Sequence, residues 1–377
     1  MKRISIITYH RADNYGSVLQ AFALSRTIAA MSREMKVQVL DYSNAGQQAI
    51  YRLRQPVRGV MDVARMAQTL VHLGALRRKR RRFEQFRRDY LPLSSYVGSD
   101  ASRLPALTAE DFAVVSGSDQ IWNVRTYDYD DNYMLRFVRP GTRKVAYAPS
   151  LGLSSFTQEE EDVLRRNLAD YDALSVREQA GAEVLQRVLG REVPVVLDPV
   201  YLYSVQKWRD LAGLGQAGLP QGGYLLGYFI ADIAGMRDFA QRMGRAMGLP
   251  VVTIVKNLHD VGRPFRHAYD AGPLEFLQLI TGARAVVTDS FHAVSFSLLL
   301  HKPFWVFTEE GEAGLQKPNS RIENILGRVG LLHRRLTAAT AAECDVAEEV
   351  DFAAADDVLA GLRRASLDYL GHALFVD

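Results

Sequence analysis

The sequence predicts an α/β protein with parallel sheets, organised as two domains followed by a C-terminal helix. Three observations support this fold class. Short apolar segments rich in β-branched residues alternate with longer helical segments along the chain. The 377 residues are more than one ordinary hydrophobic core accommodates. A glycine-rich stretch, Gly213–Gly223, separates two such series of segments and is the best candidate for a domain boundary.

These observations predict an N-terminal domain at residues 1–212, a second domain at 220–345 and a helical tail at 346–377. The helix of the tail is expected over Asp356–Leu370, packed back on the first domain. The expected strands are short and apolar: Ile4–Thr8, Val37–Asp41, Phe112–Ser116, Lys144–Ala148, Ala173–Val176, Pro194–Leu197, Tyr224–Ile230, Val251–Val255, Ala285–Thr288 and Phe304–Phe307. Helices are expected between most of them, including Ser17–Met31, Glu159–Leu168, Glu178–Leu189, Met236–Met247 and Leu274–Thr281.

Composition excludes several classes of protein. Hydrophobic residues make up 48% of the chain and charged residues 24%, the profile of a soluble globular protein. No apolar run reaches the roughly 20 residues that a membrane-spanning helix needs, and the apolar segment near the N-terminus is too short for a signal peptide. The single cysteine, Cys344, excludes an internal disulfide, and no Cys/His cluster has zinc spacing. We therefore expect a cytoplasmic protein without a metal or a bound cofactor.

The net charge of +3 is small but unevenly distributed. Residues 77–88, within a basic arm at about 52–90, contain eight basic residues and one acid. This run suits an anionic membrane surface or a nucleic acid, and it equally suits a solvated helix face. The run has only two aromatic residues, Phe83 and Phe86, and their spacing favours packing in the core over contact with a nucleic acid. We therefore prefer the membrane surface and expect no nucleic acid.

The most informative segment lies near residue 290. The expected strand Ala285–Thr288 leads directly into Asp289, Ser290 and His292, and an apolar helix follows as far as Lys302-Pro303. Ligands of α/β proteins bind at the carboxyl ends of strands, and a helix N-terminus there favours an anion. A lone buried histidine is more often structural, but an acid three residues earlier favours a functional His292 with Asp289 beside it.

Two further polar loops follow expected strands. The first, His10 to Ser17, contains Asp13, Asn14, Tyr15 and Gly16, where glycine permits close backbone approach and Ser17 can cap the helix. It lacks the dinucleotide fingerprint, and an ordinary capped loop is the alternative. The second, Ser116 to Asn123, combines polar groups suited to sugar hydroxyls with an aromatic ring, and a tight turn with a core tryptophan is the alternative. Its candidate sugar contacts are Ser118, Asp119, Gln120, Trp122 and Asn123.

Two arginines stand at the starts of expected helices. Arg177 follows the expected strand Ala173–Val176, and Arg321 follows Asn319-Ser320. A guanidinium in such a position can hold a carboxylate or phosphate with two hydrogen bonds. A surface ion pair for Arg177, for instance with Glu178, and a plain helix cap around Arg321 are the alternatives.

These segments, in this order, resemble the polysaccharide pyruvyl transferase family over roughly residues 4–332. The runs Gly117–Asn123 and Asp289–His292 are the most specific. The supporting matches are Asn14–Ala21, Val176-Arg177-Glu178, Leu197-Asp198-Pro199, Lys302-Pro303-Phe304 and Ser320-Arg321. The resemblance implies two Rossmann-like domains in a GT-B-like arrangement with the site between them. It also implies transfer of pyruvate from phosphoenolpyruvate, as co-substrate, onto two hydroxyls of a sugar to form a cyclic ketal.

The resemblance also implies roles for individual residues. In the family a histidine and arginines handle the donor, and these match His292 and Arg177. Another branch has an arginine two residues before the histidine, where this chain has Ser290, so Arg321 or Lys302 is the expected replacement. Ala293 stands where glycine is usual. His292 would act as the general acid, oriented by Asp289, because imidazole exchanges protons near neutral pH.

On the acceptor side, Asp119 would contact the sugar and Trp122 would stack on it. The expected acceptor is a free oligosaccharide, a lipid-linked saccharide or a nucleotide sugar, in exopolysaccharide or cell-envelope assembly. The alternatives are a GT-B-type glycosyltransferase with a nucleotide-sugar donor, using the loop at Lys256, Asn257, His259 and Asp260, and a non-catalytic binder of carbohydrate or nucleic acid.

Overall fold

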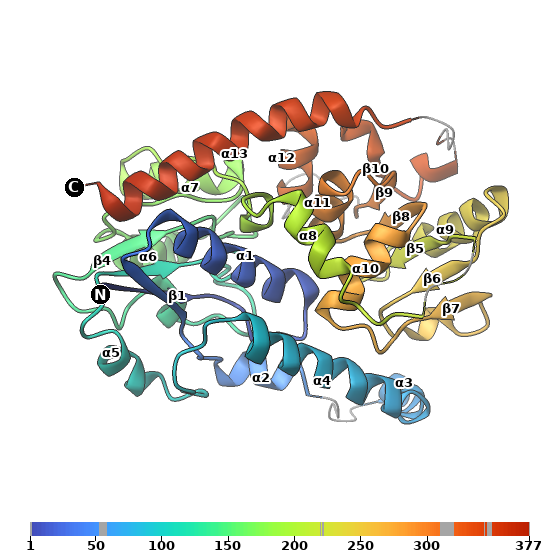
Figure 1. The fold of residues 1–377 in the computed structure, drawn as a ribbon, viewed down its shortest axis with the longest axis horizontal. Coiled ribbons are helices and arrows are strands. Elements are labelled where there is room, and N and C mark those ends of the chain that lie inside the picture. Colours follow the sequence, from blue (N-terminus) through green and yellow to red (C-terminus); the bar gives the residue numbers. More distant parts are fainter. Residues whose placement is uncertain are drawn as a thin grey trace.

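The chain forms two parallel β-sheets that lie towards opposite ends of the long axis of the molecule, with helices packed around them (Figure 1). The computed structural model describes residues 2–52, 59–218, 220, 222–309, 320–342, 344 and 349–376. Asn319, residues 53–58 of the predicted basic arm, and residues 346–348 and 377 of the predicted tail lie outside this part of the chain.

The first sheet has the order β2-β1-β3-β4 and all of its pairs are parallel. Its strands are β1 (Lys2–Ile7), β2 (Met35–Val39), β3 (Ala113–Ser116) and β4 (Arg143–Ala146). The helices in the part of the chain up to residue 212 are α1 (Tyr15–Met31), α2 (Ala45–Ile50), α3 (Val60–Val71), α4 (Leu73–Tyr90), α5 (Leu104–Leu107), α6 (Gln158–Leu168), α7 (Gln179–Leu189) and α8 (Val205–Ala212). Of these, α3 and α8 lie beside the second half (Figure 1). The central strands are apolar on both faces because helices cover both.

Two expected strands of this half are reduced to single bridges. Segments 173–176 and 194–197 pair only at Val145–Ala173 and Val176–Val195. The Ser175 hydroxyl replaces part of the ladder, since it donates to the Ala146 carbonyl at 2.9 Å and accepts from the Ala148 amide at 3.2 Å. The apolar pattern is therefore correct about burial but overestimates regular strand pairing.

The second sheet has the order β10-β9-β8-β5-β6-β7 and is also parallel. Its strands are β5 (Leu225–Tyr228), β6 (Val251–Thr253), β7 (Phe265–His267), β8 (Ala285–Thr288), β9 (Phe304–Phe307) and β10 (Arg335–Leu336). The helices are α9 (Met236–Ala246), α10 (Pro273–Gly282), α11 (Phe291–Leu299), α12 (Ser320–Arg328) and α13 (Phe352–Phe375). The edge strands β7 and β10 were not predicted, because β7 is mostly exposed and β10 has only two residues.

One hydrophobic core joins the two halves. Tyr15, at the start of α1, stacks on Phe276 of α10 with ring centroids 4.5 Å apart and planes 5° apart. Its hydroxyl donates to the Ala271 carbonyl at 2.9 Å. A stacked, fully buried aromatic pair with its polar group satisfied is a rigid contact. The start of α1 is therefore held against the second half of the molecule.

The last helix, α13, packs back on the first sheet, as the sequence predicts, and runs along one edge of the molecule (Figure 1). Ser366 accepts from the Leu197 amide at 2.9 Å, and Tyr369 donates to the Ala146 carbonyl at 2.9 Å. Leu370 and Leu374 are buried among the strand residues of this sheet. None of the described helices is both long enough and apolar enough to cross a membrane.

The helix α4 carries the basic run 77–88 and lies along the opposite edge, reaching from one half to the other (Figure 1). Phe83 and Phe86 are buried in the shared core, as their spacing predicts. Arg82 donates to the Asp270 carbonyl at 2.9 Å and pairs with Glu275 at 3.3 Å. Part of the basic run thus serves to attach α4 to the second half.

Lys79 of α4 provides a prediction about pH. Its ammonium lies 4.6 Å from the centroid of the Tyr15 ring, and burial lowers the pKa of Lys79 from 10.5 to about 8, with Asp13 opposing the shift. Between these values the unfolded state binds more protons, so stability rises with pH there. We expect the free energy of unfolding to rise by about 1–2 kcal/mol from pH 7.5 to pH 9.5 as Lys79 loses its proton. Urea unfolding at both pH values should reveal this gain, and Lys79→Met should lack it.

Lys207→Met is the matched control, because Lys207 is exposed and lies 5.4 Å from the ring of Tyr203. This variant should respond to pH like the parent protein. An equal pH response in the parent and in Lys79→Met would show that the native state does not disfavour the Lys79 charge.

Candidate functional site

The loop after β1 meets the N-terminus of α11 at a very close approach between Gly16 and His292. A Cβ atom built on Gly16 would lie 1.9 Å from Nδ1 and 2.2 Å from Cγ of the imidazole. No real side chain tolerates such distances, so only glycine permits this contact. Two motifs that are far apart in the sequence therefore meet at the junction of the two halves.

Asp198 lies at the centre of the cluster around His292. Its Oδ2 atom is 3.5 Å from His292 Nε2, accepts from Arg177 Nη1 at 2.6 Å, and accepts from the Ser118 hydroxyl at 3.0 Å. Burial alone would raise the Asp198 pKa, but His292 and Arg177 outweigh it and hold that pKa well below its usual range. Asp198 is therefore a carboxylate at neutral pH and a counter-ion for Arg177.

Arg177 is buried and only partly satisfied. Its guanidinium lies 4.6 Å from the centroid of the Phe291 ring, and its nearest carboxylates after Asp198 are those of Asp119 and Glu178, each 4.0 Å away. Within the described residues, its Nε and Nη2 atoms have no hydrogen-bond partner, and neither has the Nε2 atom of His292, which is 3.5 Å from Asp198. Buried donors without partners are costly in a native protein, so they indicate a site that a ligand completes.

Arg321, in the first turn of α12, is the second cation of the cluster. Together with Arg177 it lines a cavity of about 10 Å³, enough for one water molecule. The Gln120 side-chain amide lies 2.9 and 3.0 Å from its terminal nitrogens and accepts from them when its oxygen faces the guanidinium. Burial and the nearby Arg177 charge lower the pKa of Arg321 to about 10. Within the described residues it has no salt bridge, and its Nε atom is unpartnered.

Asp119 closes the cluster on the side of the first sheet. It has a φ of 81°, a left-handed conformation that is uncommon outside glycine and is typical of strained functional turns. Its carboxylate accepts from the Ser17 hydroxyl and from the backbone amide of Gln120, the latter at 2.8 Å. The side chain is 12% exposed, so the carboxylate is close to solvent but not free in it.

Comparison with known proteins gives the family of this chain. A model of the polysaccharide pyruvyl transferase family matches residues 14–311. The chain belongs to this family. The match includes every residue of the cluster described above except Arg321. A comparison with curated proteins found no match.

Solved structures resemble this pyruvyl transferase family member in fold. MnaA of S. aureus, in complex with UDP, has a TM-score of 0.53 at 10% identity, over 100% of this chain and 98% of its own. The UDP-GlcNAc 2-epimerase of Methanocaldococcus jannaschii, in complex with UDP-GlcNAc and UDP, has a TM-score of 0.52 at 12% identity, over 97% and 100%. These likenesses confirm the predicted GT-B-like α/β fold.

The predicted partnership of Asp289 with His292 is wrong in this family member. Asp289 accepts from the backbone amides of Ile230 and Ala231 at 2.8 and 2.5 Å, so its carboxylate shapes the end of β5. Burial raises the pKa of Asp289 against the effect of these donors. Asp198 occupies the place beside the imidazole instead. The motif Leu197-Asp198-Pro199 is the signal in the sequence for this residue, and it was assigned no role.

Trp122 and Asn123 do not form an open sugar platform. The indole of Trp122 is fully buried, donates to the Ser116 hydroxyl at 3.0 Å and packs against Tyr171. Asn123 is buried and contacts the Gln120 amide at 3.1 Å. The alternative interpretation, a tight turn with a core tryptophan, is therefore correct for Trp122, whereas Ser118, Asp119 and Gln120 do reach the cluster.

Most side chains of the predicted acceptor loop after β1 contact other parts of the protein. Asp13 accepts twice from Arg87 of α4 at 3.1 Å, and Asn14 caps α1 by accepting from the Gly16 amide at 2.9 Å. Tyr15 is buried in the shared core. Of this loop, Gly16 is the residue that touches His292.

Lys302 lies at the wrong end of α11 to replace a donor contact. His292 stands in the first turn, whereas Lys302 follows the last, and the helix from His292 to Leu299 alone spans about 10 Å. Burial lowers the pKa of Lys302, and the nearby Arg209 and Arg284 add to this effect. Ser290 is close to His292, where it caps α11 by accepting from the Ala293 amide at 3.4 Å.

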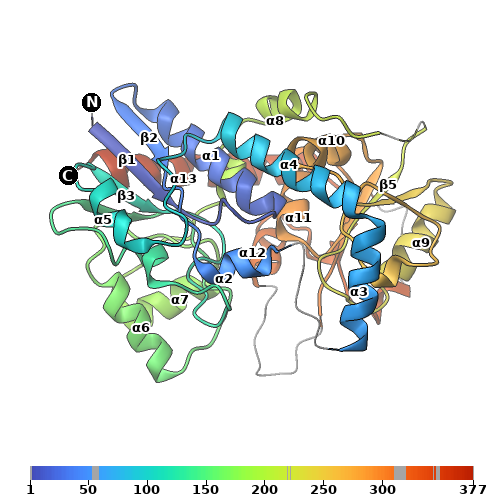
Figure 2. The same ribbon diagram turned by 90° about the horizontal axis from the view of Figure 1, so that it is seen from below.

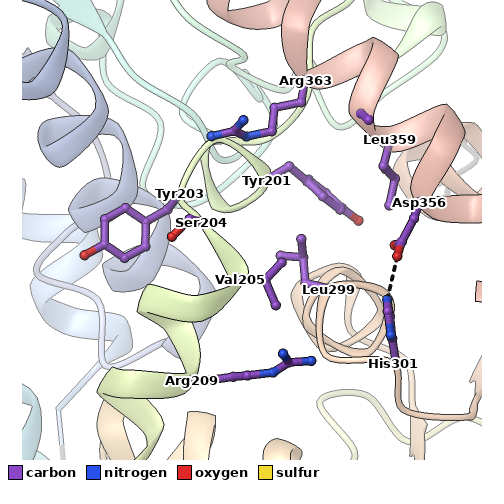
Figure 3. A pocket seen from close by; sticks show the side chains of 11 residues that line it. Tyr201, Tyr203, Ser204, Val205, Arg209, Leu299, His301, Asp356, Leu359 and Arg363 are labelled. Carbon is purple, nitrogen blue, oxygen red and sulfur yellow. Dashed lines mark hydrogen bonds and ion pairs between the residues drawn. The ribbon is translucent and has the colours of Figure 1, made fainter.

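A second, larger cavity lies behind the cluster. It has a volume of about 400 Å³ and opens between α8, α11 and α13 (Figure 3). Tyr201 borders both this cavity and the small one beside Arg177 and Arg321. His301 and Asp356 form an ion pair of 2.8 Å at the cavity wall (Figure 3).

Proposed function

We propose that this protein transfers pyruvate from phosphoenolpyruvate to two hydroxyls of a saccharide and forms a cyclic ketal. One observation supports the donor above all. Arg177, Arg321 and His292 meet around Asp198 with four buried nitrogen atoms that have no hydrogen-bond partner among the described residues. Phosphoenolpyruvate carries a carboxylate and a phosphate, which are the groups that paired guanidinium donors hold best.

In this proposal the two arginines have different tasks. Arg177 is already neutralised by Asp198 and offers Nε and Nη2 as positioning donors. Arg321 has a neutral neighbour, Gln120, and supplies the positive charge that the family branch with an arginine at the position of Ser290 obtains there. Because the cavity of about 10 Å³ is too small for the donor, we assign the donor to the side of the arginines that faces His292 and Asp119.

The proposed reaction begins with a proton from His292 to the methylene carbon of phosphoenolpyruvate, which makes C2 electrophilic. A sugar hydroxyl forms the first C2–O bond, and its proton returns to the imidazole. The C2–O bond to phosphate then breaks. The second hydroxyl forms the second C2–O bond, which closes the ketal, and its proton passes to the departing phosphate. Asp198 stabilises the imidazolium through its charge, and Asp119 is the candidate to align or deprotonate a hydroxyl.

The acceptor belongs to the same proposal. A sugar that reacts at two hydroxyls must approach Asp119, beside Ser17 and Ser118, on the side of the first sheet. We assign it to the class of polysaccharides and their precursors, including lipid-linked saccharides. The corresponding setting is exopolysaccharide or cell-envelope assembly on the cytoplasmic face of a membrane.

Donor binding can be tested by thermal denaturation with phosphoenolpyruvate. A ligand that binds the native state at ten times its Kd adds about 1.4 kcal/mol, which for a protein of this size raises Tm by about 2 °C. We expect Arg321→Met to lose most of this increase. Arg245→Met is the matched control, because Arg245 is exposed on α9 and lies away from the cluster.

Lys302→Met should also retain the full increase in Tm, since Lys302 lies at the far end of α11. Equal stabilisation of the parent protein and Arg321→Met would remove Arg321 from the donor site. Arg177→Met is a poorer probe, because it leaves Asp198 buried beside one cation fewer and is expected to destabilise the fold itself.

A nucleotide-sugar donor is the second candidate function. It is favoured by the fold shared with MnaA and the epimerase, whose structures contain UDP or UDP-GlcNAc. The same thermal assay with UDP, UDP-GlcNAc and other nucleotide sugars separates the two. Stabilisation by a nucleotide and none by phosphoenolpyruvate would favour glycosyl transfer, and stabilisation by saccharides alone would favour a non-catalytic carbohydrate binder.

A further inference from the structure

The helix α3 turns apolar side chains towards solvent. Val63, Met66 and Leu70 are spaced i, i+3 and i+7, so they share one face of the helix, and they are 57%, 37% and 60% exposed. Met61 and Val71, near the ends of the helix, are 56% and 77% exposed. Single exposed apolar residues are ordinary, but a contiguous row on one helix indicates a surface that binds something.

Polar groups hold the opposite side of α3 to the protein. Gln68 donates to the Asn257 carbonyl at 2.8 Å, and Lys256 lies 3.4 Å from the Gln68 side-chain oxygen and 3.5 Å from the Arg65 carbonyl. Gln68 is two residues before Leu70, which is about 200° around a helix. The helix is therefore attached to the protein through Gln68, while the row of Val63, Met66 and Leu70 faces away from this attachment.

Exposed arginines continue this surface along α4, which begins two residues after α3 ends. Arg77, Arg80 and Arg81 are exposed, and Arg77 and Arg81 are one turn apart. In the part of the chain that the structure describes, neither Arg77 nor Arg81 forms a salt bridge. Both helices lie on the face of the molecule that is nearest the viewer in Figure 2.

We propose that the apolar face of α3 and the arginines of α4 dock on an anionic lipid bilayer. An interfacial helix buries its apolar face at the boundary between head groups and acyl chains, while adjacent basic residues neutralise anionic head groups. The two features lie on consecutive helices. A nucleic acid would match the arginines but would leave Val63, Met66 and Leu70 in water, so a membrane is the better occupant.

This docking surface deepens the proposed function, on which it rests in one respect: a lipid-linked saccharide acceptor would be held at the same membrane. The inner side of α4 connects the surface to the site. Arg87 of α4 binds Asp13 at 3.1 Å, three residues before Gly16. Docking along α3 and α4 would thus place the bilayer beside the loop that contacts His292.

Vesicle sedimentation with the full chain tests the proposal without any assay of turnover. We expect binding to mixed phosphatidylcholine–phosphatidylglycerol vesicles, weaker binding to pure phosphatidylcholine, and a loss with added salt. Leu70→Asp should weaken binding about tenfold, and Arg77→Gln combined with Arg81→Gln should weaken it by about tenfold or more. The matched controls are Val358→Asp on α13 and Arg245→Gln with Arg364→Gln, all at exposed positions on other helices. They should bind like the parent.

Three outcomes would overturn the inference. The first is no sedimentation with anionic vesicles, and the second is equal binding by Leu70→Asp. The third is a Leu70-dependent dimer that excludes vesicles, which would assign the surface to a second copy of the chain. Vesicle binding without stabilisation by phosphoenolpyruvate would support the docking surface while contradicting the proposed donor, so the two proposals fail separately.

Discussion

His292→Gln is expected to reduce ketal formation by about 10²- to 10⁴-fold, the usual contribution of a general acid. Glutamine keeps a polar side chain beside Asp198 and Gly16 but cannot deliver a proton to the methylene carbon of phosphoenolpyruvate. The loss should appear in kcat, whereas stabilisation by phosphoenolpyruvate should largely remain, because the two arginines are unchanged. The measurements are release of inorganic phosphate with a saccharide acceptor and, separately, Tm with and without the donor.

His259→Gln is the control for this variant. His259 also pairs with a carboxylate, that of Asp232 at 2.9 Å, but both side chains are about half exposed and lie near η4 (Leu258–Asp260). Its turnover should match that of the parent protein. Turnover of His292→Gln within threefold of the parent would exclude His292 as the acid. Loss of donor stabilisation together with turnover would instead mean that the imidazole binds the donor.

The fold was predictable because burial in a parallel sheet leaves a local signal. Strands such as Ala285–Thr288 are short, apolar and β-branched, and the helices between them have amphipathic or apolar periodicity. Where that signal weakens, the prediction fails: β7 exposes two of its three residues, and the Ser175 hydroxyl competes with backbone pairing. Local patterns report burial and period, and they carry little information about which edges pair.

The sequence predicts which residues form the site better than it predicts which of them contact one another. His292, Arg177, Arg321 and Gly16 were all identified from strand ends and motifs, and the structure brings them together. Which carboxylate reaches the imidazole could not be deduced, because Asp198 and His292 lie in different halves of the molecule. A local rule favoured Asp289, three residues away, but a residue just before a helix often turns to satisfy backbone amides instead.

Trp122 illustrates a related limit of sequence reasoning. An aromatic residue among polar ones suits both a sugar platform and a buried turn, since composition is the same in either case. Only the hydrogen bond from its indole to Ser116 and its full burial decide between them. Residue type thus indicates chemistry, whereas the direction of a side chain depends on contacts made elsewhere in the chain.

Gly16→Ala should have the second large effect, because one methyl group would occupy the position of the imidazole. The added Cβ would lie 1.9 Å from His292 Nδ1, so the ring must move by an ångström or more. Misplacement on this scale can cost about 100-fold in rate, and forcing an extra carbon into a packed site costs about 1–3 kcal/mol. Turnover and urea unfolding of the variant would measure both. Gly361→Ala is the control, because a Cβ there meets open space on α13 and should be neutral or stabilising.

A double-mutant cycle with His292→Ala identifies the cause of the Gly16 effect. The cycle compares free energies of unfolding. If the clash with the imidazole is responsible, Gly16→Ala should barely lower this free energy in the His292→Ala background, and the two substitutions should be strongly non-additive. If instead the start of α1 rejects any side chain at Gly16, the cost should be the same in both backgrounds. The second result would contradict the direct contact between the two motifs, on which the assignment of the site depends. Alanine is otherwise favourable at a helical position, so the cycle isolates a steric effect that helix propensity would oppose.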